Sequence, residues 1–157
     1  MAQSFQIRPL MRESFENLFD RSLGELRNLG VEVFKVETNP GYPCRVSLQE
    51  APVGSEVLLM NFDHLTVETP FRSKGPIFVQ RNALTATTKV NEVPAMLRSR
   101  PLSIRGYDSH GMMVDADVVA GAELESTIEL LFAQASIEFL HVHFAKRGCF
   151  ACQVNRA

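Results

Sequence analysis

The sequence predicts an α+β fold in which a bent, largely antiparallel sheet carries two or three packed helices. Strand-like segments outnumber helical ones, and most connections are too short for the crossovers that parallel strands require. Several segments alternate apolar and polar residues, which is typical of strands with one buried face. A partly closed barrel is an alternative that the same pattern allows.

Length and composition predict a single domain over residues 1–157. The chain is 45% hydrophobic and 22% charged, enough apolar content for a sizeable core. Its formal net charge of −2 gives no electrostatic reason to bind nucleic acid or an acidic membrane surface. No segment has the apolar length of a membrane span or a secretory signal. Three cysteines without such a signal favour reduced thiols and a cytoplasmic location.

The N-terminal third predicts a short strand and two short helices. A strand is expected at residues 5–8, and apolar residues at helical spacing predict a helix over about residues 11–20. Ser22, followed three residues later by Glu25, predicts the capped start of a second helix, and Gly30 is suited to its end. Further strands are expected at 31–36, 44–48, 57–60, 77–81, 102–107 and 112–119, a helical turn at 94–98, and a longer helix after Gly121.

The C-terminal residues predict a hairpin. Leu140 and Phe144 alternate with His141 and His143, so the two sets face opposite sides of a strand. A three-residue loop ending at Gly148 then returns the chain. The expected pairs are Phe144 with Phe150, Val142 with Cys152, and Leu140 with Val154, which leaves Ala151 and Gln153 on the histidine face.

His141 and His143 are the strongest candidates for chemistry. Two imidazoles spaced two apart on a strand can supply two ligands to a divalent transition metal, or an acid and a base to one substrate. A third metal ligand is sought in Cys149, in His64, which is expected in a turn, or in an acidic residue such as Asp108. The alternative is a half-exposed sheet face without a special role.

Arginines on two predicted strands suggest an anion site. Arg45 shares a strand face with Ser47, and Arg105 shares one with Ser103 and Tyr107. If these faces meet the histidines, they form a cationic pocket for a small anion, with Arg72 in a loop over it. The solvent-facing side of an antiparallel sheet has the same pattern, so that reading stays open.

The spacing of Cys149 and Cys152 does not favour a dithiol or zinc pair. Residues three apart on a strand face opposite sides, and the hairpin register places Cys152 in the core.

Six segments of the chain form a recognisable set of motifs: residues 41–48, 70–72, 75–79, 102–105, 141–143 and 148–149. On these segments the chain resembles a bacterial family known as domain of unknown function 1203. The resemblance implies a free-standing bacterial protein of one domain and brings no established activity, so it assigns no catalytic residue. The candidates that fall within these segments are Cys44, Arg45, Arg72, Arg105, His141 and His143.

Three functions are therefore considered. The first is a pocket for a small anionic ligand or substrate, with His141 and His143 as acid, base or polar contacts and with Arg45, Arg72 and Arg105 holding the anion. The second is a metal site on the two histidines. The third is a non-enzymatic module whose sheet face or edge docks a partner. The sequence leaves open whether the chain is an enzyme and whether it forms homo-oligomers.

Overall fold

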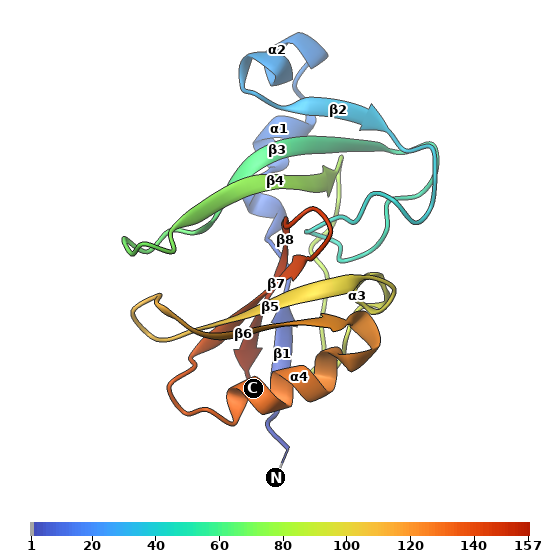
Figure 1. Ribbon diagram of the computed structural model, residues 1–157. Coiled ribbons are helices and arrows are strands. Elements are labelled where there is room, and N and C mark those ends of the chain that lie inside the picture. Colours follow the sequence, from blue (N-terminus) through green and yellow to red (C-terminus); the bar gives the residue numbers. More distant parts are fainter. Residues whose placement is uncertain (1) are drawn as a thin grey trace. The chain divides into compact units, whose positions relative to one another are not determined.

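The computed structural model describes residues 2–157, which form two compact units. Unit 1 contains residues 2–8, 63–74 and 88–157, and unit 2 contains residues 9–62 and 75–87. Each unit is described by itself (Figure 1). That residues 1–157 fold as a single domain stays a prediction.

Unit 1 is built on a five-stranded sheet with the order β1-β8-β7-β5-β6. Each neighbouring pair is antiparallel, as short connections between strands predict. The strands are β1 (Phe5–Arg8), β5 (Pro101–Tyr107), β6 (Met113–Ala120), β7 (Phe139–Phe144) and β8 (Phe150–Arg156).

One face of this sheet is apolar and forms the core of unit 1. Ile104 pairs with Val142, which pairs in turn with Cys152, and all three side chains are fully buried. Helix α4 (Leu124–Phe132) runs along the sheet and buries four apolar side chains at helical spacing (Figure 1). A short helix, α3 (Ala95–Arg98), and a 3-10 turn, η2 (Gly121–Glu123), complete the unit. The opposite face of β5, β7 and β8 carries His141, His143 and Arg105 together with aromatic side chains.

Unit 2 contains most of a three-stranded sheet with the order β2-β3-β4. Its core gathers apolar side chains from these strands and from the N-terminal helices, among them Phe15, Leu26 and Leu58. Ser22 caps α2 by accepting a hydrogen bond from the Glu25 amide at 3.2 Å, as predicted. The elements are η1 (Arg12–Ser14), α1 (Glu16–Phe19), α2 (Leu23–Asn28), β2 (Glu32–Lys35), β3 (Glu56–Leu65) and β4 (Ser73–Gln80).

The structure confirms the α+β class and corrects several details. The sheets are open and do not close into a barrel. Residues 44–48 form turns with isolated bridges, closed by a hydrogen bond from the Leu48 amide to the Cys44 carbonyl, so the predicted strand there is wrong. The expected helix over residues 11–20 is two short pieces. Strand β3 runs five residues beyond the predicted end at residue 60 and includes His64, which is therefore not in a turn.

The hairpin of β7 and β8 forms with one difference from its predicted register. Leu140 pairs with Val154 and Val142 with Cys152, as expected, and Gly148 adopts a positive φ of 79°. A bulge then shifts the ladder, so His143, and not Phe144, is the partner of Phe150. Phe150 thus lies on the histidine face, where the sequence pattern did not place it.

Candidate metal centre

Strand β7 presents His141 and His143 on the polar face of the five-stranded sheet. Both side chains are almost completely buried, with an exposed fraction of 1% each. On the neighbouring strand, Arg105 is the register partner of His141, and Ser103 is the partner of His143. The polar face of β5 therefore lies beside the two histidines, which the sequence alone had left open.

His64, near the end of β3, completes a cluster of three imidazoles within unit 1. The centroid of its ring lies 5.8 Å from that of His141 and 4.9 Å from that of His143. One ring nitrogen of each histidine lies within 4.8 Å of one from each of the others. The cluster can thus hold a metal ion through three nitrogen ligands.

Hydrogen bonds to acceptors determine which nitrogen of each β7 histidine carries the proton. The Nδ1–H of His143 donates to the Gly148 carbonyl at 2.9 Å, because a carbonyl oxygen can only accept. The Nε2–H of His141 donates to Oε1 of Gln153 at 3.2 Å, and the Gln153 amide in turn donates to Asn155 at 2.8 Å. In the neutral rings, Nε2 of His143 and Nδ1 of His141 therefore bear lone pairs.

These lone-pair nitrogens have no partner. Nδ1 of His141, Nε2 of His143 and Nδ1 of His64 are each buried and make no hydrogen bond. A buried polar atom without a partner loses its hydration and gains nothing in return, so such atoms are uncommon in folded proteins. Ring orientation by a carbonyl acceptor on one nitrogen, with the other nitrogen left open, is the arrangement found in metal-binding histidines.

Burial also keeps the cluster uncharged at neutral pH. Loss of hydration is the main cause that lowers the pKa of His141 from 6.5 to about 4 and that of His143 to about 3. The positive charge of Arg105 contributes to both shifts. The pKa of His64 is lowered by the same two causes, in the same order, and is partly restored by Asp63. Neutral imidazole is the form that binds metal.

Aromatic rings surround the histidines. Phe150, brought to this face by the bulge in β8, stacks on His64 with ring planes 2° apart and meets His141 edge-on at 5.0 Å. Tyr107 and Phe139 each lie 5.2 Å from His141, measured between ring centroids. These rings limit the access of water, which strengthens electrostatic interactions inside the cluster.

Comparison with known protein families finds a match. The model of the family described as "protein of unknown function (DUF1203)" matches residues 41–156. This match covers well over half of the chain. The chain belongs to the DUF1203 family. No curated protein and no solved structure matches it significantly.

The remaining candidates of unit 1 in this DUF1203 protein lie outside the cluster. Arg72 is exposed and pairs with Glu68. The Asp108 carboxylate accepts the amides of His110 and Met112, so it closes the turn between β5 and β6. Cys149 is not one of the three residues of the metal group.

Arg45 and Cys44 belong to unit 2 and have structural contacts there. Arg45 is buried and donates to the Pro43 carbonyl at 2.6 Å. The Cys44 sulfur accepts the Gln80 amide at 3.3 Å. Because residues 44–48 are not a strand, the strand-face argument that grouped Arg45 with Ser47 is wrong. All three histidines of the metal group of this DUF1203 protein lie in unit 1.

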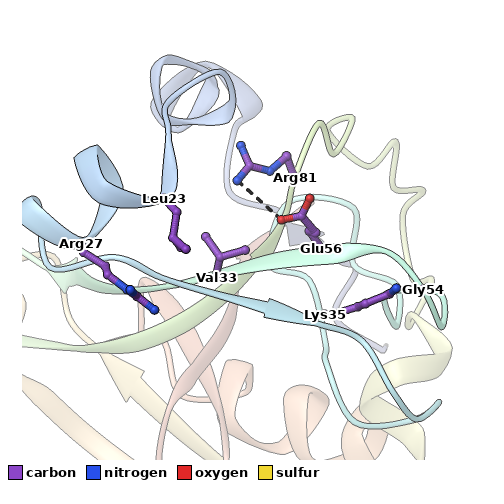
Figure 2. A pocket seen from close by; sticks show the side chains of 7 residues that line it. All are labelled: Leu23, Arg27, Val33, Lys35, Gly54, Glu56 and Arg81. Atoms are coloured by element: carbon purple, nitrogen blue, oxygen red, sulfur yellow. Dashed lines mark ion pairs between the residues drawn. The ribbon is translucent and has the colours of Figure 1, made fainter.

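An open depression of about 540 Å³ in unit 2 has a different character (Figure 2). Arg27, Lys35 and Arg81 line it together with Glu56. Two of its cations are already paired: Arg81 lies 3.8 Å from Glu56, and Arg27 lies 3.5 Å from Glu32. We therefore place the candidate site of this DUF1203 protein at the histidines.

Among residues 2–157, no helix has both the length and the apolar character needed to cross a membrane.

Proposed function

We propose that this protein binds a divalent transition metal through His64, His141 and His143, and that the metal activates a water molecule for hydrolysis or hydration of a small substrate. Two observations carry this proposal: one ring nitrogen of each histidine lies within 4.8 Å of one from each of the others, and each ring has one buried nitrogen without a hydrogen-bond partner. Imidazole is a common ligand of Zn²⁺, and the cluster offers no thiolate or carboxylate that would favour another metal.

The dimensions of the cluster suit a tetrahedral ion. At the usual Zn–N distance of about 2.0–2.1 Å, tetrahedral ligand nitrogens lie about 3.4 Å apart. The observed nitrogens are within 4.8 Å of one another, a range from which three imidazoles can close on one ion. Three protein ligands leave a fourth position for water or substrate, which is typical of catalytic zinc sites and not of structural ones.

The protonation of the histidines supports a ligand role over an acid or base role. With the pKa of His141 lowered to about 4 and that of His143 to about 3, neither ring is the imidazolium cation that could act as an acid at neutral pH. Both are also too weakly basic to take one up efficiently there, because a good catalytic base has a pKa near the working pH. The same shifts reduce competition between protons and metal for the lone pairs.

A metal held by three histidines supplies a nucleophile at neutral pH. Bound Zn²⁺ lowers the pKa of its water to about 7, so hydroxide is available without a separate base. The surrounding aromatic rings of Phe150, Tyr107 and Phe139 limit bulk water around this position. Hydrolysis or hydration is therefore the reaction class that this site supports best.

The direct test is the metal content of protein purified without chelators and without a histidine tag. We expect about one equivalent of Zn²⁺ per chain after incubation with the metal and dialysis, measured by elemental analysis. His143→Gln removes one ligand and should retain less than about a tenth of an equivalent. His110→Gln is the matched control, because His110 lies in the exposed turn between β5 and β6.

Two results would overturn the proposal. One is wild-type protein that retains less than about a tenth of an equivalent of any of Zn²⁺, Co²⁺, Ni²⁺ and Mn²⁺. The other is His143→Gln protein that folds and retains as much metal as the wild type. Tetrahedral cobalt absorption in the visible range, present in wild type and His110→Gln and absent in His143→Gln, supports ligation by this cluster.

A further inference from the structure

We propose that the fourth position on the metal binds a small oxyanion, with one oxygen on the metal and another on the guanidinium of Arg105. This inference rests on the proposed metal site and deepens it, because it names the substrate class. The residues that carry it are Arg105 and Tyr107 on β5, directly beside the histidines of β7.

The donor set of the cluster leaves the charge of the metal uncompensated. Three neutral imidazoles bring no negative charge to a divalent cation, unlike thiolate or carboxylate ligands. Arg105, the cross-strand partner of His141, adds a further positive charge beside the imidazoles. The acidic group whose charge acts on His64 is Asp63, the preceding residue of β3, and its side chain is exposed. A half-buried site with this excess of positive charge favours an anionic ligand.

Arg105 is positioned to hold such a ligand. It is the cross-strand partner of His141, and directly opposed residues of an antiparallel pair have Cβ atoms about 4.5–5.5 Å apart. Its side chain is half-buried and donates to the Ser103 hydroxyl at 3.4 Å. Within residues 2–157, no carboxylate forms an ion pair with it. Arginine presents a planar fork of N–H groups that matches carboxylate and phosphate oxygens.

Tyr107 supplies a second donor. Its phenol lies close enough to Arg105 for the two groups to interact, and its ring centroid lies 5.2 Å from that of His141. A phenol O–H can donate a hydrogen bond to an oxygen bound nearby. Stacking on Phe139, with ring planes 18° apart, holds the phenol ring in place.

The test uses cobalt-loaded full-length protein titrated with sodium acetate and, separately, with inorganic phosphate. A bound oxyanion changes the visible absorption of tetrahedral Co²⁺, so the titration gives a dissociation constant. Arg105→Gln removes the guanidinium and should weaken anion binding about ten- to a hundredfold, the range for a hydrogen bond to a charged group. Arg147→Gln removes the same charge from the exposed turn between β7 and β8 and should leave binding unchanged.

Metal content measured on the same samples separates the two proposals. If wild-type protein binds none of Zn²⁺, Co²⁺, Ni²⁺ and Mn²⁺, the metal site is refuted and the oxyanion site falls with it. If cobalt binds and Arg105→Gln changes the anion dissociation constant by less than about twofold, the oxyanion site alone is refuted. If the Arg105→Gln protein no longer binds cobalt, Tyr107→Phe is tested in its place. An anion dissociation constant raised about threefold or more by Tyr107→Phe supports the inference, and an unchanged constant refutes it. Acetate and phosphate then show which oxyanion geometry the site prefers.

Discussion

The stability of the metal-free protein should depend on pH through His141 and His143. Burial lowers the pKa of these groups from 6.5 to about 4 and about 3, so the folded protein resists protons that the unfolded chain accepts. Because the histidine pKa is lower in the folded protein than in the unfolded chain, the contribution of each histidine to stability is complete above pH 6.5. This contribution is lost as the pH falls towards the pKa of the folded protein. The unfolding free energy should therefore decrease between pH 7 and pH 5.

The size of this decrease follows from proton linkage. Each pH unit below 6.5 costs about 1.4 kcal/mol for a group that is protonated only in the unfolded chain. Between pH 7 and pH 5, each histidine therefore removes about 2 kcal/mol, and the pair removes about 4 kcal/mol. That amount is a large share of the total stability of a typical domain, which is about 5–15 kcal/mol.

Urea unfolding at pH 7 and pH 5, with a chelator present, measures this effect. The comparison is made within each variant, so any constant cost of a substitution cancels. His143→Gln should lose about 2 kcal/mol less than wild type over this interval, because one of the two linked groups is gone. His110→Gln, in the exposed turn, should lose as much as wild type. If His143→Gln and wild type lose the same free energy, the imidazole of His143 is not buried as a neutral group and the reasoning is refuted.

Three further outcomes are expected. Gln153→Leu removes the acceptor that orients His141 and should weaken Zn²⁺ binding about ten- to a hundredfold in competition with a chromophoric chelator; unchanged affinity would contradict the orienting role. Gly121→Ala places a Cβ 2.1 Å from the Leu97 carbonyl oxygen, so urea unfolding should show a loss of at least about 2 kcal/mol. Gly24→Ala, inside α2 with open space around the new methyl group, should instead raise stability by about 0.5–1 kcal/mol.

Alternation along a strand was enough to predict half of the candidate site. The spacing of His141 and His143 placed both rings on one face, and the same reasoning placed Arg105 and Tyr107 on the matching face of β5. Periodicity succeeds here because β5 and β7 are regular and adjacent in the sheet. Pairing between strands that are distant in sequence brought these faces together.

The rest of the candidate site could not be predicted from the alternation of apolar and polar residues. His64 was placed in a turn because the apolar run ends at Met60, although β3 continues with alternating residues to Leu65. Phe150 was assigned to the core because a bulge adds one residue without leaving a mark in the sequence pattern. Arg45 was placed on a strand face because residues 44–48 read as extended, whereas local hydrogen bonds close them into turns.

The energetics of the three histidines favour a ligand over a purely structural role. Each buried nitrogen without a partner costs about 1–3 kcal/mol relative to a satisfied or apolar replacement. Three such atoms together cost roughly as much as the net stability of a small domain. Apolar side chains on the same face would pack without this cost, since Phe150 and Tyr107 already make it hydrophobic. Coordination of one cation satisfies all three nitrogens at once, so occupied protein should unfold at markedly higher urea concentration than metal-free protein.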